Sequence, residues 1–188
     1  MGTDKAALQF GGISLLDRAV TLLSTVVDEV FVAVRSGHRD DPVRSKFTVI
    51  EDVFEDIGPA AGVLSAHVRY PESAWLVIAC DMPLLDESIL AFLCGARDEQ
   101  YAATALAAAP GEPAEPLCAI YEPGTLAAFL AQVNAGGNSS PRSWLASART
   151  KILPSPVKGA LVSANTAVDL ARMIEAIASR PSASDRKP

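Results

Sequence analysis

Continuous apolar runs alternate along this chain with segments in which apolar residues recur every three or four positions. The clearest run, residues 75–79, is followed by Cys80, Asp81 and then Met82-Pro83. An uninterrupted apolar run bounded by turn residues predicts a strand buried on both faces, as in a parallel sheet covered by helices. Ligands bind beyond the carboxyl ends of such strands, so Asp81 is well placed to hold a metal ion on a polyphosphate.

The remaining patterns predict alternating helices and strands. Residues 14–27 have helical spacing, with Ser14 as a candidate N-cap and Asp17 three positions later, and Asp86 is a candidate N-cap for a helix over 86–95. Further helices are expected over 58–68, 124–135, from Pro141 onward and over 166–178, and further strands over 29–34, 48–51, 102–108, 117–121, 151–153 and 160–162. Residues 110–116 are expected to form a loop, with Pro116 at the start of an edge strand.

This alternation predicts one α/β domain over residues 1–179, with a three-layer α/β/α arrangement and a mostly parallel sheet. Residues 180–188 are rich in serine, proline and charge, which is typical of a flexible tail.

Composition narrows the class of partner. The chain has 188 residues, 49% hydrophobic and 20% charged, with a net charge of −6. The sequence has no excess or cluster of basic residues that would attract a polyanion. Nucleic acid and anionic membrane surfaces are therefore excluded as expected partners. The three cysteines, Cys80, Cys94 and Cys118, are widely spaced in apolar segments and are expected to be buried thiols. With neither a membrane span nor a secretory signal in the sequence, we expect a cytoplasmic protein.

The candidate chemistry rests on Lys5, Asp52 and Asp81, which follow predicted strands or glycine turns. The sequence contains no P-loop, no G-x-G-x-x-G and no recognisable Ser/His/Asp set, and His38 and His67 lack zinc-ligand spacing. A metal-assisted, phosphate-directed site is the remaining hypothesis.

Each of these features also has an ordinary structural interpretation. A lone acid can be solvated or can cap a helix, and Lys5 can be a surface lysine. Residues 58–62 can be a tight turn before a helix, and Asn165 with Thr166 can be an N-cap pair.

Six segments together resemble one family. In order, they are Met1-Gly-Thr-Asp-Lys5 followed by residues 6–12, Val49-Ile-Glu-Asp52, Gly58-Pro-Ala-Ala-Gly62, Ala79-Cys-Asp-Met-Pro83, Pro116-Leu-Cys-Ala-Ile-Tyr121 and Asn165-Thr-Ala-Val-Asp-Leu170. Their order and spacing resemble the landmarks of the molybdenum cofactor guanylyltransferases, over residues 1–171. The resemblance implies a nucleotide-diphospho-sugar transferase fold, of the glycosyltransferase-A-like α/β type.

The resemblance also implies an activity. It is the transfer of GMP from GTP to molybdopterin or the molybdenum cofactor, with release of pyrophosphate and a requirement for Mg²⁺. Lys5 would contact the phosphates, Asp52 the nucleotide and Asp81 the Mg²⁺. Molybdoenzymes or their chaperones would be further partners.

Two other segments receive roles from the resemblance. Gly58, Pro59 and Gly62 would let the backbone approach the nucleotide closely, which requires small residues. Asn165 and Thr166 match a motif associated with the pterin side.

The chain departs from the family pattern in two places. The family carries L-A-G-G-x-S-x-R directly before the segment that here begins at Met1. We therefore expect the first, central strand to be missing, through a start codon assigned too far downstream or a shortened paralogue, and we expect weak or no transferase activity from the 188-residue form. Ala33 stands where some members have an asparagine that contacts the nucleotide, and Arg35 or Ser36 is the expected substitute.

Two other functions stay open from the sequence. One is a cytidylyl- or sugar-nucleotidyltransferase of the same fold, because the sequence does not decide between GTP and CTP or identify the acceptor. The other is an inactive paralogue that binds molybdoenzymes or their chaperones. The sequence also leaves the oligomeric state open.

Overall fold

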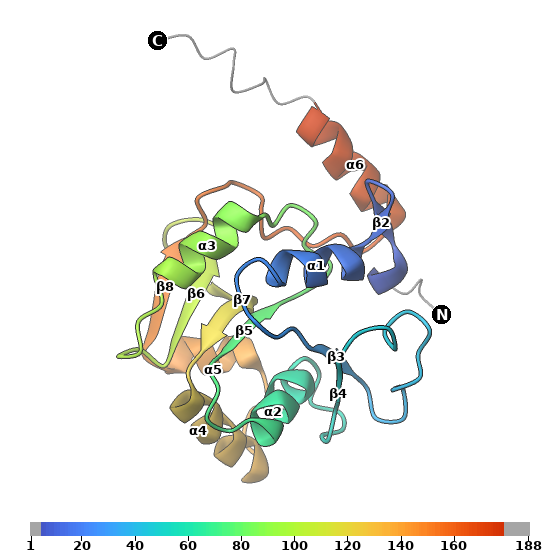
Figure 1. Ribbon diagram of the computed structural model, residues 1–188. Coiled ribbons are helices and arrows are strands. Elements are labelled where there is room, and N and C mark those ends of the chain that lie inside the picture. The colour runs from blue at the N-terminus through green and yellow to red at the C-terminus, as the bar shows by residue number, and fades with distance from the viewer. Residues whose placement is uncertain (1–4, 179–188) are drawn as a thin grey trace.

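Four strands form the main sheet, in the order β5-β7-β6-β8. They are β5 (Trp75–Ile78), β6 (Ala103–Ala107), β7 (Ala114–Tyr121) and β8 (Thr150–Pro154). Strand β7 is antiparallel to β5 and β6, whereas β6 and β8 are parallel, so three strands run one way and β7 runs against them. The structure, a computed structural model, describes residues 5–178 (Figure 1).

Two smaller strand pairs lie beside this sheet. Strands β3 (Val32–Val34) and β4 (Val49–Glu51) are parallel, and β1 (Gln9–Phe10) and β2 (Ile13–Ser14) form a short hairpin after the 3₁₀ turn η1 (Lys5–Ala7). Within residues 5–178, no strand pairing joins β3 to β5.

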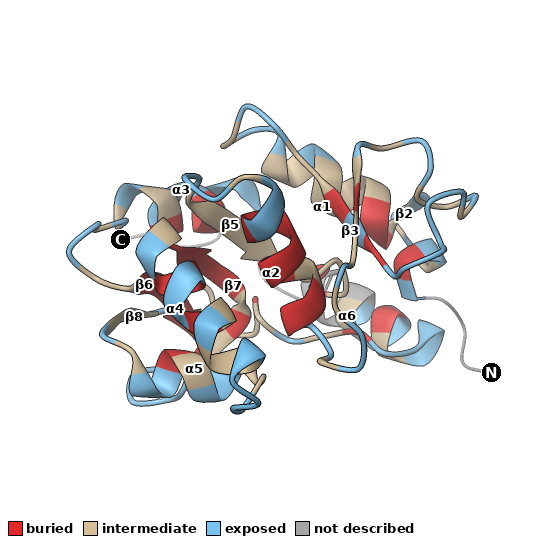
Figure 2. Ribbon diagram, turned by 90° about the horizontal axis from the view of Figure 1, so that it is seen from below, coloured by how far each residue is buried: buried red, intermediate tan, exposed pale blue. Residues whose placement is uncertain are grey.

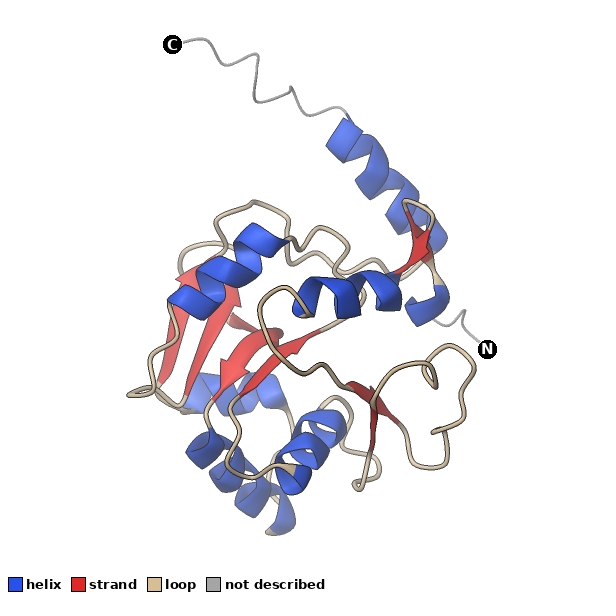
Figure 3. Ribbon diagram, in the orientation of Figure 1, coloured by secondary structure: helices blue, strands red, loops and turns tan. Residues whose placement is uncertain are grey.

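Helices cover both faces of the main sheet (Figures 1 and 3). On one face lie α1 (Leu15–Leu23) and α3 (Glu87–Gly95), and on the other lie α2 (Ala60–Arg69), α4 (Pro123–Asn134) and α5 (Pro141–Ser147). Helix α6 (Ala167–Ala178) projects beside the β1–β2 hairpin. The predicted three-layer α/β fold is confirmed.

The core is divided between the two faces of the sheet, as the buried residues in Figure 2 indicate. Leu93 of α3 packs with Leu106 and Ile120 on one face, and Leu64 of α2 packs with Phe129 on the other. All five side chains are at most 4% exposed. Burial of apolar side chains from both layers therefore fixes the helices against the sheet.

Local signals in the sequence place two helix starts correctly. Ser14 Oγ accepts a hydrogen bond from the Asp17 amide at 3.0 Å, and Asp86 Oδ1 accepts one from the Ile89 amide at 3.0 Å. Each bond satisfies an amide that has no partner within the first turn of a helix. Both predicted N-caps are confirmed.

Two predicted elements were wrong. Strand β7 begins at Ala114, inside the predicted loop 110–116, and Pro116 lies in a strand with neighbours on both sides. The β6–β7 pairing shifts register between Ala105 and Ala107, and such an irregularity accommodates a proline that cannot donate to the ladder. Residues 160–162 form a turn rather than a strand, with the Ala160 amide bonded to the Val157 carbonyl at 3.2 Å.

The burial predictions also needed correction. Every residue of β5 is only half-buried, and among residues 5–178 no strand pairs with the edge of β5 that faces β3. Of the three cysteines, Cys118 is buried, whereas Cys80 and Cys94 are half-buried. Within the described residues, no helix is long and apolar enough to cross a membrane. The predicted tail, residues 180–188, lies outside the described part of the chain.

Candidate functional site

Asp81 lies just beyond the carboxyl end of β5, as the sequence predicts. The Ala79 amide still donates to the Leu117 carbonyl at 2.9 Å, so the pairing with β7 holds the chain until two residues before Asp81. The Asp81 carbonyl accepts from the Ala164 amide at 2.7 Å, and Leu85 is 1% exposed. The backbone around Asp81 is therefore fixed from both sides.

Three predicted site residues meet at this point. Lys5 Nζ lies 3.2 Å from Asp81 Oδ2 and donates to Asn165 Oδ1 at 2.5 Å. The Asp81 side chain is 15% exposed and that of Lys5 is 45% exposed, so the ammonium group faces solvent while the carboxylate is largely covered. Residues 76 and 160 positions apart in the sequence thus form one polar cluster, which we call the Lys5–Asp81–Asn165 cluster.

Thr166 differs from its neighbour Asn165. Thr166 Oγ1 accepts from the Asp169 amide at 3.1 Å and donates to the Asp169 carboxylate at 2.9 Å. That carboxylate also accepts from the Asn165 and Thr166 amides, and these hydrogen bonds lower the pKa of Asp169. Thr166 therefore caps α6, whereas the Asn165 side chain points to Lys5.

Asp52 occupies the equivalent place at the end of β4. Its amide donates to the Val34 carbonyl at 2.7 Å, which extends the β3–β4 pairing by one residue. Helix α2 packs closely here, because a Cβ added to Gly62 would lie 2.7 Å from the Ala33 Cβ and 3.6 Å from Asp52 Oδ1. Gly58 has φ +60°, a conformation that favours glycine. Both glycines of the Gly58–Gly62 segment are thus required by the local geometry.

A cavity of about 740 Å³ opens beside Asp52. Its lining comes from the ends of β3 and β4 and the start of α2, and includes Arg35, Ser36, His38, Asp52, Gly58 and Pro59. Burial raises the pKa of Asp52, and the nearby Arg35 guanidinium opposes that effect. A cavity of this size is within the usual range for a small-molecule site, and most of its lining residues are polar or charged.

Two carboxylate oxygens at these strand ends have no hydrogen-bond partner. Within residues 5–178 they are Asp52 Oδ1 and Asp81 Oδ1, and both are buried. A buried acceptor without a partner is unfavourable unless a ligand satisfies it. The orphaned oxygen of Asp81 fits Mg²⁺, which in phosphate sites takes one or two protein carboxylates and completes its shell with phosphate and water oxygens.

The described residues do not provide a complete set of protein ligands for a metal ion. In the described part of the chain, no group of three or more His, Cys, Asp or Glu side chains is placed to hold a metal ion. Such a site suits Mg²⁺ brought with a polyphosphate better than a structural zinc ion.

The predicted residues therefore fall into two groups. Lys5, Asp81 and Asn165 meet after β5, whereas Asp52 lies with the Gly58–Gly62 segment after β4. Across residues 5–178, no hydrogen bond or ion pair links Asp52 to the Lys5–Asp81–Asn165 cluster. Sequence reasoning gave no role to Asp169, although the Thr-x-x-Asp spacing is a capping-box signal that could have identified it.

Comparison with known sequences gives a family match. Residues 1–152 match the family described as "MobA-like NTP transferase domain". The "Molybdenum cofactor biosynthesis bifunctional protein" of Synechocystis sp. is 29% identical over 72% of this chain and 39% of that protein. The "Molybdenum cofactor guanylyltransferase" of Shewanella frigidimarina is 28% identical over 72% of this chain and 68% of that protein. A "Probable molybdenum cofactor guanylyltransferase" of Natronomonas pharaonis is 32% identical over 69% and 64% of the two chains. The aligned part thus spans between 39% and 68% of these relatives.

Comparison with solved structures supports the fold. The structure titled "Molybdopterin-guanine dinucleotide biosynthesis protein A from Archaeoglobus fulgidus" superposes with a TM-score of 0.75 at 18% identity, covering 95% of this chain and 93% of that one. A nucleotidyl transferase from Methanothermobacter gives a TM-score of 0.71 at 20% identity, covering 94% and 86% of the two chains.

Proposed function

The chain belongs to the MobA-like NTP transferase domain family, and on that basis we propose that it acts in the transfer of GMP from GTP to molybdopterin or the molybdenum cofactor, with release of pyrophosphate. Two of the similar proteins are named molybdenum cofactor guanylyltransferases, one of them as probable. The single structural observation that carries the proposal is the Lys5–Asp81–Asn165 cluster at the end of β5.

Each residue has a role in this proposal. Lys5 binds the GTP phosphates, because a lysine ammonium is a compact cation that neutralises phosphate charge. Asp81 holds Mg²⁺ through its unpartnered Oδ1. Asp52 contacts the nucleoside in the cavity beside Arg35, and Gly58 lets the backbone approach it closely.

The reaction is an in-line displacement at the α-phosphorus of GTP. A phosphate oxygen of the acceptor forms the new P–O bond, and the bond to the β-phosphate breaks, so that pyrophosphate leaves with its electron pair. Mg²⁺, when bound, neutralises charge on the phosphates and orients them. Lys5 lowers the repulsion between the incoming and resident oxygens, and no covalent intermediate on the chain is required.

Asn165 is proposed to lie on the acceptor side. Its amide oxygen is held by Lys5, and the capping bonds of Asp169 fix its backbone. The side-chain NH₂ remains available to donate to an acceptor molecule. Thr166 would act on the acceptor only through this backbone, because its hydroxyl is used in the helix cap.

A thermal-shift experiment tests the nucleotide assignment. GTP, CTP and UTP are added separately, each with and without Mg²⁺. The proposal predicts the largest rise in melting temperature for GTP with Mg²⁺, because a ligand that binds only the folded state stabilises it. A shift equal for all three nucleotides, or no shift with GTP, contradicts guanine selectivity.

A further inference from the structure

Two oppositely charged side chains, Arg35 and Asp52, line the cavity at the ends of β3 and β4. Asp52 Oδ1 is buried and has no hydrogen-bond partner among the described residues. The Arg35 guanidinium makes no hydrogen bond or ion pair within residues 5–178, and it lies close enough to Asp52 to oppose the rise in pKa that burial causes. Both groups are therefore available to a ligand in the cavity.

The backbone holds these two residues at the ends of neighbouring strands. The Val34 carbonyl accepts from the Asp52 amide at 2.7 Å, so Arg35 follows directly on the residue to which Asp52 is bonded. On the other side of Asp52, the Val53 amide donates to Ser65 Oγ of α2 at 2.9 Å, and Ser65 is 2% exposed. The Asp52 carboxylate thus projects from a backbone that is bonded on both sides, whereas Arg35 is exposed.

The charge of this cavity argues against a phosphate group as its occupant. Three carboxylates, from Asp52, Glu55 and Asp56, line it together with the guanidinium of Arg35. Negative charge is therefore in excess, and an anionic phosphate would be repelled. An uncharged ring with N–H donors suits such a lining better, because carboxylate oxygens accept hydrogen bonds.

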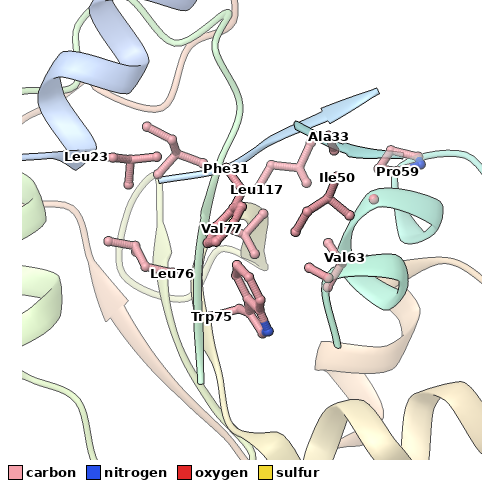
Figure 4. Close-up of a pocket in the computed structure, with 13 residues that line it drawn as sticks. Leu23, Phe31, Ala33, Ile50, Pro59, Val63, Trp75, Leu76, Val77 and Leu117 are labelled. Atoms are coloured by element: carbon pink, nitrogen blue, oxygen red, sulfur yellow. The ribbon is translucent and has the colours of Figure 1, made fainter. Parts of the chain in front are cut away.

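Apolar side chains border the cavity on the side toward the sheet. Ala33, Ile50 and Pro59 lie together where β3, β4 and α2 meet (Figure 4). Pro59 lines both this apolar space, of about 200 Å³, and the larger cavity that holds Arg35 and Asp52. A nucleotide base fits this combination, because its faces stack on apolar surface and its edges carry hydrogen-bonding groups.

Guanine is the base whose edges match these two side chains. It carries N–H donors at N1 and at the 2-amino group, and acceptors at O6 and N7. A carboxylate only accepts hydrogen bonds, and a guanidinium only donates them. Adenine and cytosine have a ring-nitrogen acceptor beside their amino group, and uracil has one N–H between two carbonyls. Each of these three bases would therefore place an acceptor against the carboxylate, which is unfavourable in a buried site.

We propose that Arg35 and Asp52 together select guanine as the base of the nucleotide. The Asp52 carboxylate accepts from N1–H and the 2-amino group, and the Arg35 guanidinium donates to O6 and N7. This role rests on the proposed function and extends it, because it names the side chains that set base specificity. Arg35 rather than Ser36 takes the role, since a hydroxyl has one donor and a guanidinium offers two parallel N–H groups.

Four nucleotides that differ only in the base test this selection on the 188-residue chain. They are GTP, inosine triphosphate without the 2-amino group, 7-deaza-GTP without the N7 acceptor, and xanthosine triphosphate with a carbonyl in place of the 2-amino group. Calorimetric titration with Mg²⁺ measures the affinity of each. We expect the unmodified chain to bind GTP at least about tenfold more tightly than each of the other three, because each lacks one hydrogen bond.

Two variants assign the contacts to individual side chains. Asp52→Asn should bind xanthosine triphosphate at least about tenfold more tightly than GTP, because the new NH₂ donates to the 2-carbonyl of xanthine but meets the 2-amino group of guanine. Arg35→Ala should bind GTP and 7-deaza-GTP equally, because the contact with N7 is lost. Arg39→Ala and Asp40→Asn, at exposed positions of the same loop outside the cavity lining, are the matched controls and should keep the order of the unmodified chain.

The possible failures are distinguishable. If GTP binds with Mg²⁺ but Asp52→Asn still prefers GTP to xanthosine triphosphate, Asp52 does not contact the base edge and the selection is overturned alone. Equal binding of GTP and 7-deaza-GTP by the unmodified chain overturns the role of Arg35 in the same way. If none of the four nucleotides binds, the proposed function fails and the base selection fails with it.

Discussion

Lys5 Nζ lies 3.2 Å from Asp81 Oδ2, although the two residues are 76 positions apart. The lysine side chain is 45% exposed, and pairs exposed to this degree contribute at most about 1 kcal/mol to folding. The ion pair between Lys5 and Asp81 therefore contributes little to the stability of the fold. Its position at the carboxyl end of β5 instead suits a site that binds phosphate and metal together.

Lys5→Ala should weaken nucleotide binding without changing the stability of the folded protein. We expect the affinity for GTP with Mg²⁺ to fall by about tenfold, or about 1.4 kcal/mol, because one phosphate contact is lost. The midpoint of urea unfolding should change little. Lys46→Ala removes a comparably exposed lysine paired with Asp17 at 2.6 Å and serves as the matched control. Equal loss of affinity in the two variants would argue against a specific role for Lys5.

Asp81→Asn should remove the metal dependence of nucleotide binding. An amide oxygen is a weaker ligand for a hard divalent cation than a carboxylate. Mn²⁺ can replace Mg²⁺ as a paramagnetic probe, and its binding in the presence of GTP is measured by electron paramagnetic resonance. We expect at least about a tenfold weaker Mn²⁺ affinity. Asp98→Asn, at a surface pair with Lys151, is the control and should bind Mn²⁺ as the unmodified chain does.

Asp52→Asn should stabilise the unliganded protein in a pH-dependent way. Burial raises the pKa of Asp52 in the folded state, so ionised Asp52 opposes folding. The free energy of unfolding of the unmodified chain therefore falls, relative to the variant, as pH rises from the ordinary carboxyl pKa of about 3.9 through the raised value. Urea titrations at several pH values measure this difference. A difference that is constant with pH would show that the carboxylate is not destabilised by burial.

The Asp52 variant should also bind GTP less tightly, because the proposal gives this carboxylate a contact with the nucleoside. Greater stability with weaker binding is the expected combination for a residue kept for function. Unchanged affinity would remove Asp52 from the site.

Arg97 and Glu122 provide a structural contrast to the site. The guanidinium donates two hydrogen bonds of 2.8 Å to the Glu122 carboxylate, and Glu122 is 8% exposed. Arg97→Ala leaves a buried carboxylate without its partner and should lower the free energy of unfolding by about 2 kcal/mol. Arg142→Ala removes a single, more exposed contact with Glu115 and should cost less than about 1 kcal/mol. Chemical denaturation of both variants checks this order.

The sequence predicts local structure well where one residue decides it. Ser14 and Asp86 cap their helices as expected, because the cap hydrogen bond depends on one side chain and an amide three residues away. The same short range allowed Asp81 to be placed at a strand end. The antiparallel direction of β7 follows from its short connection to β6, which leaves no room for a crossover helix, and the predicted loop over residues 110–116 did not by itself give that direction.

Longer-range relations could not be predicted from residue patterns. Asn165 approaches Lys5 only because the segment before α6 is bonded to the Asp81 carbonyl. Half-burial of β5 depends on whether another strand lies beside it, which no pattern within residues 75–79 reveals. The family resemblance identified the landmarks, and the fold shows that they form two groups.

The central claim is that Lys5 and Asp81 act on the same bound phosphates, and a double-mutant cycle on GTP affinity tests it most directly. Calorimetric titrations with Mg²⁺ are made for the unmodified chain, Lys5→Ala, Asp81→Asn and the double variant. The account predicts non-additive losses, with a coupling free energy of at least about 0.5 kcal/mol, because both residues contact one metal–phosphate group. Strictly additive losses, or no loss in either single variant, would contradict it.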